Sequence, residues 1–295
     1  MNLEPPSLNF FKFSFQLIFS IAPLLLIGAC APEPIELGQA NYQLDAVLNY
    51  CANNSRPGRG GIIDGESTLN GIKFNVRTPL NYNATNAHPL LVVYAPARRS
   101  RMSTERLTKL TFDATRAGFI VAYADHRALS KSAIVELGSI PKLIAEKWCI
   151  DEERVYLSGH SDGGSVAMGL AFMEETKHIP SAVAPSAAGI KHSDFALYSC
   201  PKPISVMVMH SEKDTHFPGF GKQAADWWAA CNGCDSVPSQ QIDDSCNAYP
   251  NCTNQVATWY CEGANSHADW PQINASMIQF FTSQAALVPT QFAVE

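Results

Sequence analysis

The residues whose spacing best suits chemistry lie at 159–163, where the order is Gly-His-Ser-Asp-Gly. A β-branched and apolar run at 155–157 precedes this segment, and a small-residue helical pattern at 165–171 follows it. In such a strand–turn–helix context the serine sits on a tight, strained turn and projects its hydroxyl beside the N-terminus of the helix. The pattern therefore predicts that Ser161 is a nucleophile. The alternative is a glycine-rich loop with an ordinary helix-capping serine.

A serine hydroxyl becomes a nucleophile only when a base takes its proton and a carboxylate orients that base. In α/β-hydrolases the acid and then the histidine follow the serine along the chain, each on a loop after a strand. Asp214 lies just past the predicted strand 204–210, and Glu212 is the nearer rival on that loop. His267 follows the last predicted strand. We therefore predict that Ser161, His267 and Asp214 act together.

Attack of a serine on a carbonyl creates an oxyanion, which two backbone N–H groups should stabilise. One belongs to the residue after the nucleophile, Asp162, and the other to the loop that follows the apolar run 89–96. Pro96 has no N–H, so Ala97 is the best donor of that loop. Arg98, with two further arginines close by, is either part of a solvated basic loop or a residue that binds an anionic group of the substrate.

Other aromatic residues are weaker candidates for the site. Trp270, just after the histidine loop, is a candidate for an aromatic substrate contact. His160 occupies the variable position of the serine motif, and we expect its side chain to point away from the catalytic histidine. His210 and His216 precede the final loop and are expected to be strand-end or pocket residues. The remaining histidines have no supporting context: His88, His126, His178 and His192.

Strands alternate with helices along the chain. The predicted strands are 72–78, 89–96, 118–125, one that begins near residue 154, 181–185, 204–210 and 256–261. Besides the helix after the serine motif, the predicted helices are 104–117, 133–147, 221–230 and 271–285. This alternation predicts a doubly wound α/β fold with a mostly parallel sheet. With no internal repeat, we expect one catalytic domain over residues 61–295, preceded by a polar lead at 30–60.

Composition limits the functional classes. The chain has 295 residues, is 46% hydrophobic and carries a net charge of -6, so it can bury one large core but has no basic cluster of the kind that binds nucleic acid. No metal or organic cofactor is needed for the chemistry above. We expect an ester substrate, which can be polymeric, and a monomeric protein.

The N-terminus has the pattern of a targeting segment. Residues 13–28 are mostly apolar but short for a membrane-spanning helix, and Lys12 gives a thin positive region before them. We interpret residues 1–29 as a signal peptide, of lipoprotein type, with lipidation at Cys30. The competing interpretation is ordinary cleavage after Ala31. Either implies export, to the periplasm or cell surface as a lipoprotein or as a secreted protein.

Cysteine usage supports export. Of nine cysteines, removal of Cys30 leaves eight, an even number that predicts up to four disulfide bonds without fixing which of 105 pairings forms. Five lie between Cys231 and Cys261, which predicts a disulfide-rich insertion before the last strand. The pair Cys231 and Cys234 could instead form a redox or zinc motif. The eight are Cys51, Cys149, Cys200, Cys231, Cys234, Cys246, Cys252 and Cys261.

Four segments resemble the polyhydroxybutyrate depolymerase / feruloyl esterase family of secreted α/β-hydrolases: 155–164, 200–214, 227–234 and 263–271. The similarity covers roughly residues 60–285. It implies Ser161 as nucleophile, Asp214 as acid and His267 as base. The chain departs from the family where His-Gly and small residues usually follow the oxyanion strand, because it has Ala-Pro-Ala-Arg-Arg there, and it carries one additional residue, Asp269, in the histidine loop.

The sequence thus predicts an exported serine esterase that hydrolyses carboxylic esters through an acyl-enzyme. The family implies a polyhydroxyalkanoate-like polyester or a feruloyl or acyl ester of a polysaccharide, and the sequence does not choose between them. Two alternatives stay open. One is a serine peptidase on the same scaffold, and the other is a surface lipoprotein that binds glycans or polyesters without catalysis.

Overall fold

The computed structural model describes residues 33–41, 51 and 56–285, and from Ile35 onward these residues belong to one compact unit. The signal-peptide and Cys30 predictions lie outside the described residues. Part of the predicted polar lead packs on the unit, since the Gly38 N–H donates to the Thr115 hydroxyl at 2.7 Å. Over the described residues, no helix is long and apolar enough to span a membrane.

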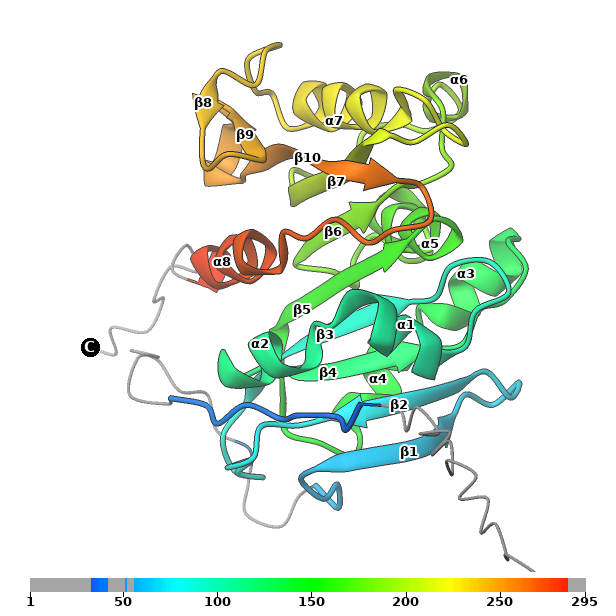
Figure 1. Cartoon of the computed structure of the whole chain (residues 1–295), viewed down its shortest axis with the longest axis vertical. Helices are drawn as coiled ribbons and strands as arrows, with labels where there is room; N and C mark the ends of the chain where they lie inside the picture. The colour runs from blue at the N-terminus through cyan, green and yellow to red at the C-terminus, as the bar shows by residue number, and fades with distance from the viewer. Residues whose placement is uncertain (1–32, 42–50, 52–55, 286–295) are drawn as a thin grey trace, which may run out of the picture. The chain divides into compact units, whose positions relative to one another are not determined.

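Within the described chain, ten strands form one sheet in the order β1-β2-β4-β3-β5-β6-β7-β10-β9-β8 (Figure 1). The six central strands are parallel: β4 (Ile120–Ala124), β3 (His88–Tyr94), β5 (Ile150–His160), β6 (Ala182–Ser186), β7 (Ser205–Lys213) and β10 (Thr258–Ser266). The edges are antiparallel: β1 (Ile62–Ser67), β2 (Lys73–Arg77), β8 (Gln240–Gln241) and β9 (Cys246–Tyr249). The loops after β3, β5, β7 and β10 therefore emerge at one edge of the sheet.

Helices cover both faces of this sheet (Figure 1). One face packs against α3 (Lys131–Leu137), α4 (Ile140–Ala145), α5 (Asp162–Phe172), α6 (His192–Phe195) and α7 (Phe220–Cys231). The other packs against α1 (Arg101–Thr108), α2 (Thr111–Arg116) and α8 (Asn274–Ala285). The predicted doubly wound α/β fold is confirmed.

Two predicted helices are wrong in one respect, because each is broken in two. The helix predicted at 104–117 ends at Lys109, which takes the left-handed conformation with φ 50°, and restarts at Thr111. The helix predicted at 133–147 breaks between Leu137 and Ile140. Pro141 explains the second break, since it has no N–H to continue a helical ladder and suits the first turn of a new helix.

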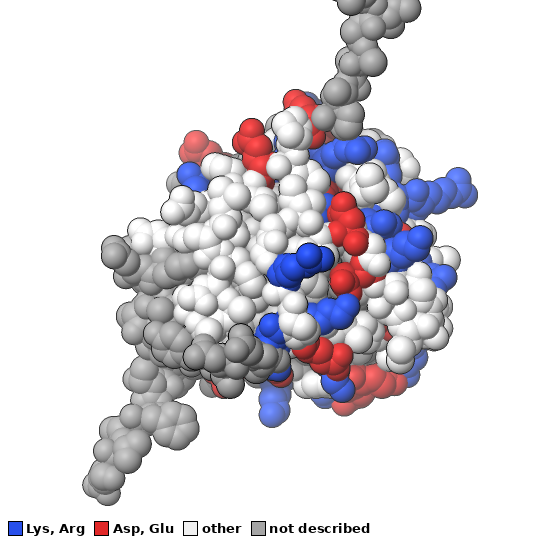
Figure 2. All heavy atoms as spheres, turned by 90° about the horizontal axis from the view of Figure 1, so that it is seen from below, with Lys and Arg blue, Asp and Glu red and all other residues white. Residues whose placement is uncertain are grey.

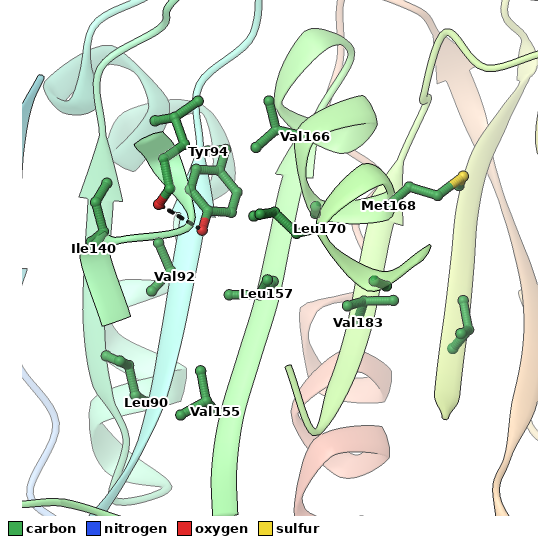
Figure 3. Close-up of a cluster of buried hydrophobic side chains, with 14 of the residues drawn as sticks. Leu90, Val92, Tyr94, Ile140, Val155, Leu157, Val166, Met168, Leu170 and Val183 are labelled. Carbon is green, nitrogen blue, oxygen red and sulfur yellow. Dashed lines mark hydrogen bonds between the residues drawn. The ribbon is translucent and has the colours of Figure 1, made fainter. Parts of the chain in front are cut away.

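The core beside α5 fixes the strands that carry the site. Leu90 and Val92 of β3, Leu157 of β5 and apolar residues of α5 belong to one buried cluster (Figure 3). Tyr94 at the end of β3 is also buried, and its hydroxyl donates to the carbonyl of Leu137 at 3.4 Å (Figure 3). Burial raises the pKa of Tyr94, so its ring stays neutral. The ends of β3 and β5 are thus held side by side.

Disulfide bonds form four pairs: Cys51–Cys149, Cys200–Cys231, Cys234–Cys252 and Cys246–Cys261. The last two close the predicted insertion, which contains the hairpin of β8 and β9. Cys231 and Cys234 bond to different partners, so the redox or zinc motif is wrong. Cys231 is the last residue of α7, and the buried Asn232 caps the helix between the two cysteines.

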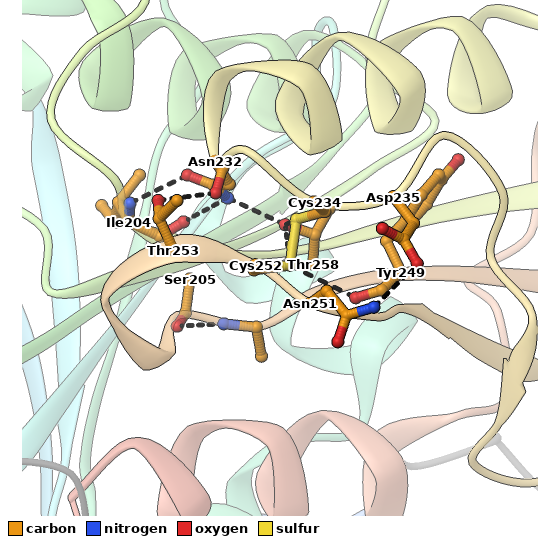
Figure 4. Close-up of a disulfide and its surroundings, with 11 residues drawn as sticks. Ile204, Ser205, Asn232, Cys234, Asp235, Tyr249, Asn251, Cys252, Thr253 and Thr258 are labelled. Atoms are coloured by element: carbon orange, nitrogen blue, oxygen red, sulfur yellow. Dashed lines mark hydrogen bonds between the residues drawn. A yellow bond between two sulfur atoms is a disulfide. The ribbon is translucent and has the colours of Figure 1, made fainter.

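Asn232 joins three segments beside the Cys234–Cys252 bond (Figure 4). Its side chain accepts from the N–H of Ile204 at 3.1 Å and donates to the Ile204 carbonyl and to the Thr258 hydroxyl, both at 2.8 Å. Ile204 directly precedes β7 and Thr258 begins β10. One buried amide therefore holds together the starts of the two strands whose far ends carry Asp214 and His267.

Charges are mixed in sign on the face drawn in Figure 2, where Lys and Arg side chains lie beside Asp and Glu and a large part of the surface is uncharged. The described residues of this face form no continuous basic stripe for a phosphate backbone.

We expect Asn232→Ala to lower the free energy of unfolding by about 3 kcal/mol, because it leaves several buried polar groups without partners. Urea unfolding followed by circular dichroism measures this change. Asn70→Ala is the matched control, since the side chain of Asn70 is exposed and its change should be close to neutral. Equal stabilities of the two variants would contradict this account of Asn232.

Candidate active site

Ser161 sits on a strained turn between β5 and α5, with φ 56° and ψ −118°. Its N–H donates to the Ser186 carbonyl at 2.9 Å. A Cβ on Gly159 would overlap the backbone of Gly163, and a Cβ on Gly163 would overlap the carbonyl oxygen of Tyr94. The two glycines of the motif are therefore required by close backbone approach, which is the local structure expected of a nucleophile turn.

A chain of two hydrogen bonds connects three loops at this edge of the sheet. Ser161 Oγ lies 2.9 Å from His267 Nε2, and His267 Nδ1 lies 2.7 Å from Asp214 Oδ2. A carboxylate only accepts, so Nδ1 carries the ring proton and Nε2 is free to accept the serine proton. The structure thus brings together the three residues that the sequence singled out, in the geometry of proton abstraction from a serine.

Asp214 is held as a carboxylate. Its side chain is fully buried, which disfavours the charged form, but hydrogen bonds from His267 and from the backbone N–H of Phe217 outweigh burial and keep the pKa of Asp214 below its ordinary value. The N–H groups of His216 and Phe217 both donate to Oδ1 at 2.9 Å. The rival acid, Glu212, is exposed, and Asp214 is the residue that bonds His267.

His160 lies where the sequence did not place it. Instead of pointing away from His267, its Nε2 donates to the His267 carbonyl at 2.7 Å, while its Nδ1 lies 3.0 Å from Ser186 Oγ. A carbonyl accepts only, so the proton is on Nε2 and the hydroxyl of Ser186 donates to Nδ1. Burial lowers the pKa of His160 to about 4. The ring is therefore a neutral clamp on the backbone of His267.

Trp270, the candidate for an aromatic substrate contact, packs inside the protein. Its side chain is buried and its indole N–H donates to Asn274 Oδ1 at 2.7 Å. Its ring lies edge-on to His160, with 6.0 Å between centroids. The loop before Trp270 explains its buried position. In this loop the Ser266 hydroxyl donates to Asp269 Oδ2 at 2.8 Å and closes a turn that directs Trp270 inward. The additional residue Asp269 thus shapes this turn.

Aromatic rings flank His267 on its open side. The exposed ring of His216 stacks on that of His267 with 4.7 Å between centroids and 18° between planes. Phe217 meets His267 edge-on at 5.0 Å and stacks on Phe220 at 5.5 Å. The sequence analysis expected only that His216 lies at a strand end or pocket and gave no role to Phe217 or Phe220. Their positions depend on the bend that Asp214 imposes on the chain after β7.

The predicted oxyanion donors lie at adjoining strand ends. Asp162 is the first residue of α5, where backbone N–H groups have no intrahelical acceptor. Tyr94 pairs with Gly159 in the sheet, so the loop that begins after β3 leaves beside Ser161. A bond from the Arg99 N–H to the Pro96 carbonyl at 3.0 Å closes this loop into a turn, with Ala97 exposed and Arg98 at φ 59°.

The three arginines of this loop differ in their surroundings. Arg98 and Arg99 are exposed. Arg101 is held by Asp125, with Nη1 and Oδ2 3.0 Å apart, and its Nε donates to Asn75 Oδ1 at 2.6 Å. Arg98 is thus available to a ligand, whereas the guanidinium of Arg101 is committed to the protein. Over the described residues, no group of three or more His, Cys, Asp or Glu side chains is arranged to hold a metal ion.

Comparison with known proteins places this geometry in context. No protein-family model matches the chain. Feruloyl esterase B from Piromyces equi is 24% identical over 230 residues, which are 67% of this chain and 42% of that protein. The chain therefore spans about two fifths of the length of this relative. The chain is similar in sequence to this feruloyl esterase.

Solved structures support the fold of this chain. The acetyl xylan esterase from Aspergillus awamori has a TM-score of 0.57 at 14% identity, covering 76% of this chain and 99% of that one. A feruloyl esterase module from Clostridium thermocellum, complexed with sinapinate, has a TM-score of 0.57 at 12% identity and covers 89% of this chain and 100% of its own. S-formylglutathione hydrolase from Staphylococcus aureus has a TM-score of 0.54 at 10% identity, with 77% and 100% coverage. The resemblance to feruloyl esterases stated from the motifs is confirmed.

The buried His160 makes stability depend on pH. Burial lowers its pKa from 6.5 to about 4 in the folded chain, whereas in the unfolded chain the ring is solvated. Between pH 4 and pH 6.5 the unfolded chain binds more protons at this residue than the folded chain does. The contribution of His160 to stability is therefore fully present above pH 6.5 and is lost as the pH drops toward 4. We expect a loss of about 3 kcal/mol from this residue between about pH 7 and pH 4.

Urea unfolding of the wild type and of His160→Gln across this pH range measures the effect. Glutamine keeps an amide donor for the His267 carbonyl but does not titrate, so the variant should lose much less stability on acidification. The same loss in both proteins would contradict the assignment to His160.

Proposed function

We propose that this chain is a serine carboxylic-ester hydrolase in which Ser161 is the nucleophile, His267 the base and Asp214 the acid. The observation that carries the proposal is the hydrogen-bonded chain from Ser161 Oγ through His267 to a buried carboxylate. The similarity to feruloyl esterase B supports the same reaction class.

In the proposed reaction, His267 Nε2 takes the proton of Ser161 as Oγ attacks the ester carbonyl. Asp214 stabilises the imidazolium that forms, and its two backbone hydrogen bonds keep it aimed at Nδ1. The N–H groups of Ala97 and Asp162 stabilise the oxyanion. The imidazolium then gives its proton to the leaving alcohol, and an acyl-enzyme remains. Water, activated by His267, releases the acid and restores the serine.

The substrate we propose is a feruloyl or acyl ester of a polysaccharide. Three features support an acyl group with aromatic character: the relative's feruloyl esterase activity, the half-buried Phe217 and the exposed His216 beside His267. Arg98, exposed on the loop after β3, is the proposed contact for a polar or anionic part of the substrate. A polyhydroxyalkanoate-like polyester is the alternative within the same reaction class.

We propose that the protein acts after export, as a secreted enzyme or as a lipoprotein anchored through Cys30. Four disulfide bonds fit an oxidising compartment, where such bonds persist. A monomer suffices, because one chain contributes all three proposed catalytic residues.

The proposed function is tested with Ser161→Ala and three esters: p-nitrophenyl acetate, methyl ferulate and acetylated xylan. We expect the wild type to hydrolyse at least one of them and the variant to lose about a thousandfold or more of kcat while keeping the wild-type circular dichroism spectrum. Turnover of peptides but no esters would favour the peptidase alternative. Binding of xylan without turnover, unchanged in Ser161→Ala, would favour the binding protein.

The assignment of the acid is tested by comparing Asp214→Asn with Glu212→Gln. Asparagine removes the acceptor that fixes the His267 tautomer, so we expect kcat to fall about a thousandfold or more. Glu212 lies on the same loop but is exposed, and its variant should keep nearly full activity. A larger loss for Glu212→Gln than for Asp214→Asn would overturn the assignment.

A further inference from the structure

Two residues that follow β4 contact both parts of the site that carry the proposed oxyanion donors. The N–H of His126 donates to the carbonyl of Arg99 at 3.2 Å, and Arg99 closes the turn that presents Ala97. The ring of the same residue reaches the other part, since His126 Nε2 lies 3.0 Å from Asp162 Oδ2. A single residue therefore bonds the loop after β3 and the first residue of α5.

Asp125 holds the far end of the same loop. Its Oδ1 accepts from the backbone N–H of Arg101 at 2.7 Å, and its Oδ2 lies 3.0 Å from the guanidinium of Arg101. Arg101 is also the first residue of α1. The arginine-rich loop that departs from the family pattern is thus fixed at Arg99 and at Arg101 by consecutive residues, Asp125 and His126.

The contact to Asp162 has an electrostatic consequence. The carboxylate of Asp162 belongs to the residue whose N–H is proposed to stabilise an oxyanion, and a negative charge there opposes a second negative charge that develops nearby. Nε2 of His126, acting as donor, draws the carboxylate toward β4 and compensates its charge. Both side chains are partly buried, with 16% of His126 and 27% of Asp162 exposed, so the pair is less screened than a surface pair.

We propose that His126 is a positioning residue that couples the two oxyanion donors, through its N–H to the Arg99 loop and through its ring to Asp162. The inference rests on the proposed function. His126 itself does not touch the reacting atoms. Its ring keeps the Asp162 carboxylate in a fixed place, so that the N–H of Asp162 can stabilise an oxyanion without repulsion from its own side chain.

The experiment is a double-mutant cycle on p-nitrophenyl acetate. His126→Ala leaves the backbone bond to Arg99 in place, so it tests the contact to Asp162 alone. We expect His126→Ala to lower kcat on the order of tenfold with little change in KM, because the loss falls on the transition state. Asp162→Asn removes the charge that His126 is proposed to compensate, so His126→Ala should lower kcat much less in the Asp162→Asn background than in the wild type.

A smaller loss of kcat in the Asp162→Asn background shows that His126 acts by compensating the charge of Asp162. If His126 only supports the fold, His126→Ala lowers kcat equally in both backgrounds. Additive losses, or wild-type kcat in His126→Ala, would overturn the proposal. His126→Phe keeps ring volume without a donor and completes the same cycle where His126→Ala does not fold. His178→Ala is the matched control, because His178 is exposed on a turn between α5 and β6.

Failure of the proposed function and failure of the role of His126 give different results. A wild type without ester turnover removes the reaction on which this inference rests. A wild type with turnover that needs Ser161, combined with an unchanged His126→Ala, contradicts only the role of His126.

Discussion

Backbone packing between the end of β3 and the turn after β5 determines the rest of the site. Gly163 lies so close to the Tyr94 carbonyl that no side chain fits, and Gly159 is equally close to Gly163. This contact holds Ser161 at positive φ, which directs its side chain out of the turn toward His267. It also places the loop after β3 beside the first turn of α5. A site with a nucleophile and oxyanion donors on different elements depends on this close approach.

Support for the acid and the base comes from a second set of buried polar contacts. Asn232 bonds the starts of β7 and β10, and His160 bonds the loop at the far end of β10. Because β7 and β10 pair in parallel, these contacts fix the strands at both ends. Disulfide bonds lie on either side of Asn232: Cys231 bonds Cys200 before β7, and Cys234 bonds Cys252 within the segment that separates the two strands in sequence. The 2.7 Å bond between Asp214 and His267 therefore joins loops that are each held by the scaffold.

The sequence was sufficient for features that depend on local pattern or chain order. The alternation of strands and helices predicted the fold, and the order of serine, acid and histidine selected the residues that the structure brings together. It was insufficient where partners come from distant segments. His160 was misplaced because its contact depends on how the final loop folds back over β5. His126 had no local signal at all, since its partners are 27 and 36 residues away.

The helix breaks and the short edge strands also include features that the sequence shows and features that depend on distant partners. Pro141 explains the break between α3 and α4, and a proline at that position is visible in the sequence. Lys109 has no such signal, although its positive φ separates α1 from α2, which both pack on β4. The short strands β8 and β9 were missed. β8 has only two residues, both exposed, and β9 has only four, one of which is bonded to β10 through Cys246–Cys261.

The central claim is that the hydrogen bonds from Asp214 through His267 make Ser161 a reactive nucleophile. Reaction of the folded protein with a fluorophosphonate, followed by mass-spectrometric mapping of the modified peptide, tests it most directly. The account predicts one adduct, on Ser161, that is absent after denaturation before labelling. Absence of labelling in the folded protein, or an adduct on another residue, would contradict the account.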